Sequence, residues 1–185
     1  RVNSVSLIKR IFDLISMMHV INMGMTQKHG AQSNWYDWPL CKMKSIPYYT
    51  SNGMSLVLTP NPFVWFSAAI GAFLSLIVAV LAFFINNSSL LHIAIWPVGY
   101  FASWLPFALI PRSLFVYHYL IPLMFGVLCF GAIFDVLLQE HKSLRSCIFC
   151  LLILCSLICW VFYTPFLYSF VGYDWDIRKW YKNFF

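Results

Sequence analysis

The sequence predicts an all-α membrane protein: a four-helix transmembrane bundle preceded by an interfacial amphipathic helix and loop. Three observations support this class. The 185 residues are 61% hydrophobic and only 10% charged, and their mean hydropathy is +0.75, far from the composition of soluble domains. Aromatic residues make up 19% of the chain, which suits lipid-facing surface and interfacial belts. Four apolar segments approach or exceed the roughly 20 helical residues that cross a bilayer.

Residues 1–61 precede the predicted spans. Within them, residues 5–23 place apolar side chains at helical spacing, with Lys9, Arg10 and Asp13 interposed. Three charges make insertion costly, so we expect an amphipathic helix on the membrane surface and not a fifth span. The Trp-rich stretch HGAQSNWYDWPL follows and is expected to form an interfacial loop. Because the chain starts at Arg1 without a signal segment, we expect it to be a piece of a longer protein.

The four predicted spans are residues 62–85, 90–110, 117–138 and 147–168. Short connections join them, at residues 86–89, 111–116 and 139–146. Short connections favour antiparallel neighbours, so we expect an up-and-down bundle. Residues 169–185 are predicted to form an interfacial C-terminal tail.

Ionisable side chains avoid the centres of the predicted spans. The first and fourth spans carry no charge, whereas His92 lies near the start of the second span, His118 at the start of the third and Asp135 near its end. The second span also contains Pro97 and Pro106, so we expect it to be kinked.

Several function classes are disfavoured. The net charge of +6 does not indicate a nucleic-acid partner, because the basic residues are scattered among apolar spans. Cys147 and Cys150 form a CxxC, but no second pair or histidine cluster stands at metal-ligand spacing, so we predict no metal and no cofactor. We also predict no catalytic residue in this segment, because no nucleophile and base with a third orienting group can be identified.

The stretch PRSLFVYHYL holds the candidate binding residues Arg112, His118 and Tyr119. A guanidinium at this turn can hold a phosphate in bidentate fashion, and His118 and Tyr119 can add hydrogen bonds to a phosphate or sugar hydroxyl. Alternatively, Arg112 extends to lipid headgroups and the other two are ordinary interfacial residues. Composition alone favours this second interpretation.

The order of the motifs resembles the C-terminal membrane region of the protein O-mannosyltransferases. The motifs are MMHVINMGM, the His, Ser and WPL of HGAQSNWYDWPL, an Asn-Pro before a Trp-bearing span, IPRSLFVYHYL and TPFLYSFVGYDWD. The matching residues are His29, Ser33, Trp38, Pro39, Leu40, Asn61, Pro62, Arg112, Phe115, His118 and Tyr119.

This resemblance implies a C-terminal segment of an enzyme that transfers mannose from dolichyl-phosphate mannose to Ser or Thr of secretory proteins. The family's acidic catalytic residues lie upstream, so the segment alone is not expected to be active. The implied partners are membrane lipid, the dolichol donor, a Ser/Thr-bearing acceptor polypeptide and a homologous subunit in a dimer, with no nucleic acid. The implied location is the endoplasmic reticulum membrane as a multi-pass protein, or the plasma membrane for a prokaryotic member.

The resemblance also places both ends of the chain in the lumen. That side would hold ten of the twelve Lys and Arg residues, whereas the positive-inside rule would assign it to the cytosol. We follow the family, since earlier helices usually set orientation in a longer chain.

Two alternatives stand beside this function. One is a structural or transport-type membrane subunit, and the other is a different lipid-linked glycosyltransferase of the same membrane fold. A transporter should show paired broken helices or ionisable residues near the bilayer midplane. The absence of midplane charge from the four predicted spans favours the transferase.

Overall fold

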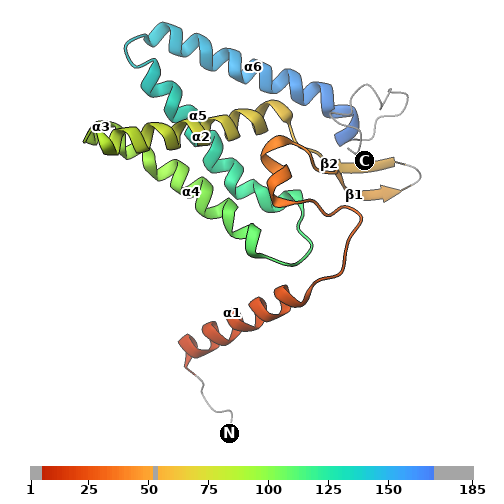
Figure 1. Cartoon of the computed structure of the whole chain (residues 1–185). Helices are drawn as coiled ribbons and strands as arrows, with labels where there is room; N and C mark the ends of the chain where they lie inside the picture. Colours follow the sequence, from red (N-terminus) through yellow and green to blue (C-terminus); the bar gives the residue numbers. More distant parts are fainter. Residues whose placement is uncertain (1–5, 52–53, 169–185) are drawn as a thin grey trace.

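The computed structural model describes residues 6–51 and 54–168 and is predominantly helical (Figure 1). The predicted tail at residues 169–185 lies outside the described residues. The longer helices are α1 (Leu7–Gly24), α2 (Pro62–Phe84), α4 (Ile95–Trp104), α5 (Leu120–Leu137) and α6 (Lys142–Leu167). The shorter elements are the turn α3 (Ser88–Leu91), the 3-10 helices η1 (Trp35–Leu40), η2 (His92–Ala94), η3 (Leu105–Leu109) and η4 (Val116–Tyr119), and the strands β1 (Ile46–Ser51) and β2 (Met54–Leu58). The predicted all-α membrane class is confirmed, with one small sheet added.

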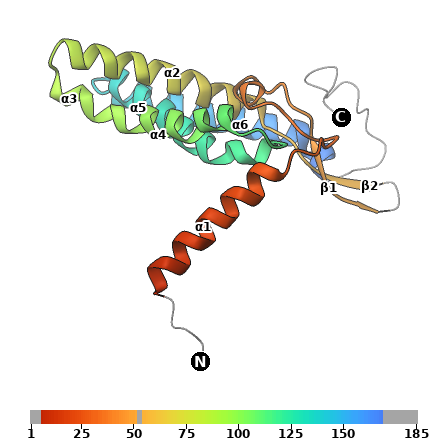
Figure 2. The same cartoon turned by 60° about the horizontal axis from the view of Figure 1, so that its bottom comes forward.

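Helix α1 forms where the helical spacing of apolar residues predicted it. None of its residues is buried, and in both views it extends away from the bundle (Figures 1 and 2). The helix therefore keeps its apolar side chains exposed along its whole length, as a surface helix that meets a membrane would. Its position on the membrane surface stays a prediction.

The expected interfacial loop contains two regular elements that the sequence pattern did not predict. The WYDWPL stretch forms η1, and β1 pairs with β2 in an antiparallel hairpin from Ile46 opposite Leu58 to Ser51 opposite Met54. The register shifts between Pro47 and Tyr49. A proline has no N–H to give to a ladder, and the β-branched and aromatic residues around it favour extended backbone.

Three helical segments of the described chain are long and apolar enough to cross a membrane: Pro62–Phe84, Val116–Leu137 and Lys142–Pro165. They match the first, third and fourth predicted spans. The fourth begins at Lys142 and not at Cys147 as predicted, because Lys and Arg are good helix formers and lengthen the helix into the interface. The connection before it shrinks accordingly.

The second predicted span is an interrupted helix. Residues 88–109 form α3, η2, α4 and η3 in succession, and the backbone stays right-handed helical at Leu91, Ala94 and Trp104, where these pieces join. Pro97 and Pro106 lie inside this stretch. Each lacks the N–H that an α-helix needs, which accounts for the expected kink and for the change to 3-10 geometry at η3.

Helices α2 and α5 cross at very short range. A Cβ built on Gly71 would lie 2.5 Å from the Phe130 Cα, and one built on Gly126 would lie 2.8 Å from the Ala68 Cβ. Most of the buried residues of α2 are small: Ala68, Ala69, Gly71, Ala72, Ser75, Ala79 and Ala82. Close backbone approach of this kind is how membrane helices gain packing energy where no hydrophobic effect drives them together.

Helix α6 is the outermost member of the bundle. Only 6% of the apolar membrane-spanning stretch of α6 is buried, against 39% of the corresponding stretch of α2. Most of the α6 surface is therefore left for lipid or another chain. Asn61, which caps α2 by accepting from the Val64 N–H at 3.3 Å, also donates its side-chain N–H to the Ser156 carbonyl of α6 at 3.1 Å. One residue therefore starts α2 and ties α6 to it.

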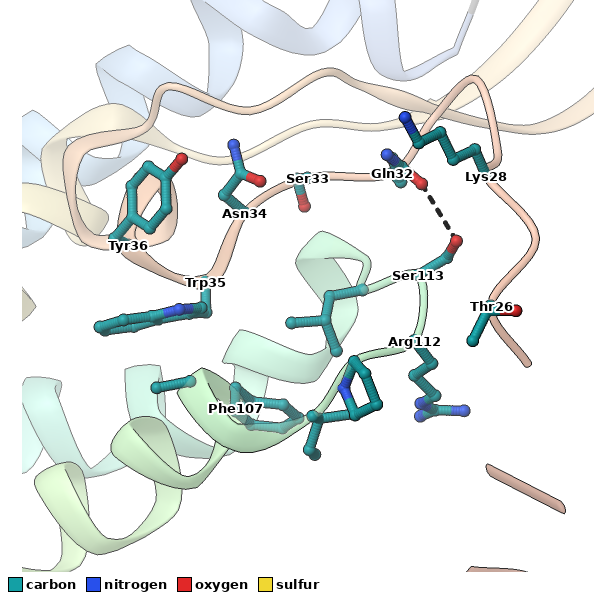
Figure 3. Close-up of a pocket in the computed structure, with 14 residues that line it drawn as sticks. Thr26, Lys28, Gln32, Ser33, Asn34, Trp35, Tyr36, Phe107, Arg112 and Ser113 are labelled. Atoms are coloured by element: carbon teal, nitrogen blue, oxygen red, sulfur yellow. Dashed lines mark hydrogen bonds between the residues drawn. The ribbon is translucent and has the colours of Figure 1, made fainter. Parts of the chain in front are cut away.

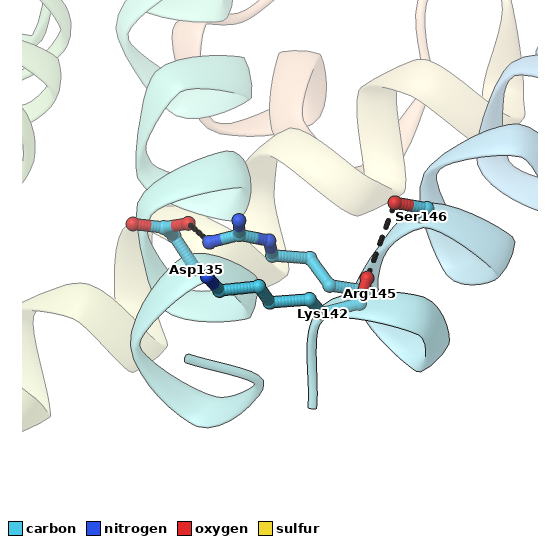
Figure 4. Close-up of polar contacts among 4 residues, drawn as sticks. All are labelled: Asp135, Lys142, Arg145 and Ser146. Atoms are coloured by element: carbon cyan, nitrogen blue, oxygen red, sulfur yellow. Dashed lines mark hydrogen bonds and ion pairs between the residues drawn. The ribbon is translucent and has the colours of Figure 1, made fainter. Parts of the chain in front are cut away.

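The turn between α5 and α6 is closed by an ion pair. Arg145 of α6 donates to the Asp135 carboxylate of α5 (Figure 4). The Asp135 side chain is 64% exposed, so the pair contributes modestly to stability. It places Asp135 at the end of the bundle opposite Arg112, as predicted.

The short α2–α5 crossing gives a test of helix packing. Gly71→Val would force a branched side chain into the Phe130 backbone, so we expect the free energy of unfolding in detergent to fall by about 1–3 kcal/mol. Gly131→Val on α5 is the matched control, because nothing lies within 4 Å of a Cβ there. Equal unfolding midpoints for the two variants would contradict the close crossing.

Candidate functional site

Trp38 fixes the segment before the membrane helices to the end of the bundle. Its side chain is fully buried, and its indole N–H donates to the Ser33 hydroxyl at 2.8 Å. The ring contacts Phe107 at a centroid distance of 5.1 Å and lies parallel to the His118 ring at 6.3 Å. This one residue therefore connects η1 to η3 and η4, the two elements on either side of the turn that carries Arg112.

Arg112 and His118 form a directed hydrogen bond. The Arg112 Nη2 lies 2.8 Å from the His118 Nε2, and because a guanidinium can only donate, Nε2 must accept. The ring proton of a neutral His118 is then on Nδ1, where it can donate to the Phe115 carbonyl at 2.9 Å. His118 is thus held as a neutral ring that orients the guanidinium.

A second partner of Arg112 comes from α1. The Arg112 Nη1 donates to the Asn22 Oδ1 at 2.8 Å. In the part of the chain that the structure describes, no carboxylate forms an ion pair with Arg112. Both partners of this half-buried cation are neutral, so its charge is left available to an anion.

Tyr119 is placed differently from His118. Its hydroxyl lies 2.7 Å from the Tyr100 hydroxyl, and both side chains are fully buried. The pair joins α4 to η4 beneath the Trp38 ring, whose centroid is 6.1 Å from that of Tyr119. In this structure, the Tyr119 hydroxyl is therefore engaged in the core and is not open to a ligand.

A polar loop closes over the turn that carries Arg112. Ser113 donates from its hydroxyl to the Gln27 carbonyl and lies 3.0 Å from the Gln32 Oε1. His29 packs edge-on against the Phe115 ring at 5.3 Å, and its Nδ1 accepts from the Ala31 N–H at 3.1 Å. The loop is therefore tied to the turn at Ser113 and at Phe115.

A cavity of about 320 Å³ lies between this loop and the turn (Figure 3). Its lining combines amide, hydroxyl and ammonium groups with aromatic and aliphatic side chains: Thr26, Lys28, Gln32, Ser33, Asn34, Trp35, Tyr36, Phe107, Ala108, Ile110, Pro111, Arg112, Ser113 and Leu114. Figure 3 shows the guanidinium of Arg112 pointing away from the centre of this cavity. The cavity and the Arg112–His118 pair are therefore neighbouring features on opposite sides of one turn.

The structure brings most of the predicted site residues together. Seven of them form one connected cluster: His29, Ser33, Trp38, Arg112, Phe115, His118 and Tyr119. Pro39 is buried beside it, whereas Leu40 is 47% exposed. Asn61 and Pro62 lie apart, at the start of α2, where Asn61 caps the helix and Pro62 is its first residue.

Sequence reasoning missed the partners of this cluster. Asn22 lies among the apolar residues of α1, and a polar side chain interrupting an apolar helix face is a signal that could have found it. Tyr100 and Phe107 carried no such signal, because an aromatic residue in a span is expected for packing alone. Their contacts depend on how α4 and η3 fold back against η4.

The structure offers no metal site within residues 6–51 and 54–168, where no three His, Cys, Asp or Glu side chains gather. Cys41 closes η1 in a left-handed conformation with φ 53° and is fully buried. Burial raises the pKa of its thiol, so it behaves as a small apolar side chain and not as a nucleophile.

The fold and the cluster together define an integral-membrane helical region with one polar, cation-bearing end. The protein family described as the C-terminal four TMM region of protein-O-mannosyltransferase matches residues 7–184, and the chain belongs to this family.

Curated relatives and a solved structure agree with the family. Dolichyl-phosphate-mannose–protein mannosyltransferase 1 of Candida albicans is 27% identical over 92% of this chain and 21% of its own length. The enzyme of the same name from Saccharomyces cerevisiae is 25% identical over 72% of this chain and 18% of its own. This chain thus spans about a fifth of these relatives. The S. cerevisiae protein O-mannosyltransferase Pmt1-Pmt2 complex bound to the sugar donor has the same fold, with a TM-score of 0.75 and 20% identity over 97% of this chain and 27% of that one.

The buried tyrosine pair gives a test of the core beneath the site. Tyr100→Phe or Tyr119→Phe alone leaves a buried hydroxyl without a partner and should lower the free energy of unfolding by about 1–3 kcal/mol. The double variant removes both hydroxyls and should be less destabilised than the sum of the two single variants. A double-mutant cycle in detergent measures this coupling, and additive losses would contradict the pairing.

Proposed function

We propose that this chain is the C-terminal membrane region of a dolichyl-phosphate-mannose–protein mannosyltransferase. The complete enzyme would move mannose from dolichyl-phosphate mannose to Ser or Thr of a secretory polypeptide, with its catalytic carboxylates supplied from outside this chain. The observation that carries this proposal is the half-buried Arg112 with two neutral partners, within a chain that matches the family over residues 7–184.

The chemistry assigns Arg112 and His118 separate tasks. When the glycosidic bond to the lipid phosphate breaks, negative charge grows on the phosphate oxygens. The Arg112 guanidinium has five N–H donors, so it can keep its bond to His118 and still present donors to that phosphate. His118 is a positioning residue, because its Nε2 holds the guanidinium and its other nitrogen is tied to Phe115.

The transport alternative finds little support in the spans. Among the described residues, α2 contains no charged side chain, α5 has Asp135 close to its C-terminus, and the charges of α6 are confined to its first turn. A transport pathway for ions or protons would need ionisable side chains near the middle of these helices. A different lipid-linked glycosyltransferase of the same fold would use the same phosphate contact and is separated from this proposal by its acceptor.

We also propose the setting in which the enzyme works. The solved structure of like fold is a complex of two subunits, Pmt1 and Pmt2, bound to the sugar donor, which supports pairing of this chain with a homologous subunit. The long exposed face of α6 provides surface for such a contact. The proposed location is the endoplasmic reticulum membrane, or the plasma membrane for a prokaryotic member, as a multi-pass protein.

Removal of Arg112 tests the proposed phosphate contact. In the full-length enzyme, Arg112→Ala should lower kcat/KM for mannose transfer about a hundredfold, because a donor to developing charge is lost. Membrane insertion and subunit pairing should persist. Transfer of radiolabelled mannose to a Ser/Thr peptide by purified enzyme measures the effect.

The control for this variant is Lys42→Ala. Lys42 is an exposed cation just after η1, and its removal leaves the cluster around Arg112 and His118 unchanged. It should leave transfer within about twofold. If Arg112→Ala behaved like Lys42→Ala, Arg112 would be a headgroup anchor and the proposed role would be wrong.

The proposed orientation puts the Arg112 end in the lumen and the α5–α6 turn in the cytosol. A membrane-impermeant maleimide added to sealed microsomes should then label Ser143→Cys but not Lys44→Cys until detergent is added, with the unsubstituted chain as background. The sequons in NNSS at Asn86 and Asn87 should also stay unglycosylated. Labelling of Lys44→Cys in intact microsomes would overturn this orientation.

A further inference from the structure

The cavity beside the Arg112 turn is a site separate from the phosphate contact. Its volume of about 320 Å³ lies at the lower end of the range of ligand pockets. It opens between the loop that precedes the membrane helices and the turn after η3, and Gln32, Asn34 and Tyr36 on its rim are exposed. Water-soluble molecules can therefore reach it without crossing the bundle.

The chemistry of the lining does not suit a phosphate. The described lining contains two cations, Lys28 and Arg112, but the Arg112 guanidinium points away from the centre (Figure 3), so Lys28 is the one left to meet a ligand there. The remaining polar groups are neutral amides and hydroxyls. A phosphate in this cavity would meet one flexible ammonium group, that of Lys28. The Arg112–His118 pair lies on the opposite side of the turn.

A hexose is also a poor match. Sugar rings are commonly held against a free aromatic face, and Trp35 is the largest ring of the cavity. That ring already contacts Trp104 at a centroid distance of 5.4 Å and Tyr36 at 5.8 Å. The Trp35 indole is therefore half-buried and already packed against two protein rings.

The lining does suit an extended polypeptide. A peptide main chain offers alternating N–H donors and C=O acceptors. The Gln32 Oε1 already accepts from the His29 N–H at 3.1 Å and lies 3.0 Å from the Ser113 hydroxyl, so Gln32 offers its Nε2 donors to a peptide carbonyl, while the Asn34 Oδ1 offers an acceptor to a peptide N–H. Phe107, Ile110 and Pro111 supply an apolar floor for small side chains. Asn34 is held in place by a hydrogen bond from its Nδ2 to the Asp37 carboxylate at 2.8 Å, so its Oδ1 is presented in a fixed direction.

We propose that this cavity binds the acceptor polypeptide, in the residues that flank the Ser or Thr to be mannosylated. The inference rests on the proposed function. It assigns the two sides of one turn to the two substrates: the Arg112 side to the lipid-linked donor and the Ser113 side to the water-soluble acceptor.

Filling the cavity tests this assignment. Ala108 lies in the lining on η3 and is exposed, so Ala108→Phe should occupy the space without breaking a core contact. In the full-length enzyme, we expect the KM for a synthetic Ser/Thr peptide to rise about tenfold or more. The KM for dolichyl-phosphate mannose and the kcat at saturating peptide should stay within about twofold.

The matched control is Ala102→Phe. Ala102 is an exposed alanine of the neighbouring α4 and lies away from the cavity, so both KM values should be unchanged. An unchanged peptide KM in Ala108→Phe would overturn the proposal. A rise in the donor KM alone would show that the cavity serves the donor, and would overturn it too.

A second measurement does not depend on transfer. A peptide with a photoreactive group beside its Ser should cross-link to residues 26–36 or 107–114 of the full-length protein, and Ala108→Phe should abolish the cross-link. Cross-linking elsewhere would contradict the assignment. If the wild-type protein showed no mannose transfer while this cross-link formed, the proposed enzymatic function would fail and the peptide site would stand.

Discussion

The burial of Trp38 is the interaction on which the polar end of the molecule depends. A long loop carries little secondary structure of its own, and ordering it costs conformational entropy for each residue. The fully buried indole, with its N–H satisfied by Ser33 and its ring against Phe107 and His118, offsets that cost at one point. It fixes η1 against the bundle, and the bonds of Ser113 to Gln27 and Gln32 hold the rest of the loop over the cavity.

The electrostatics of the site follow from the choice of neutral partners. A carboxylate beside Arg112 would neutralise it and weaken its attraction for an external anion, whereas Asn22 and His118 satisfy its hydrogen bonds without cancelling its charge. Because Arg112 is half-buried, water screens its charge less, and its electrostatic attraction for an anion is stronger than that of a fully exposed cation. The cation is thus oriented before any ligand arrives, and little ordering remains to be done on binding.

The parts of the fold that were predictable from sequence are those set by local pattern. Apolar length and helical spacing located α1, α2, α5 and α6, and the prolines of the second span indicated its interruption. The hairpin β1–β2 was missed because its alternation is short and contains Pro47. The buried bond between Tyr100 and Tyr119 joins residues 19 positions apart, and such a contact is decided by the crossing of helices and not by either residue's neighbours.

The two-sided character of the site has a local cause. Helical geometry ends with η3 at Leu109 and resumes with η4 at Val116; Ile110 and Phe115 have extended backbone, and the chain between them bends at Arg112. Because the chain is non-helical and bends here, the side chains of Arg112 and Ser113 leave it in different directions (Figure 3). Arg112 therefore bonds to α1 and His118, while the adjacent Ser113 bonds to the loop at Gln27 and Gln32. A continuous helix would separate neighbours by only 100° and could not divide one turn between two unlike surroundings.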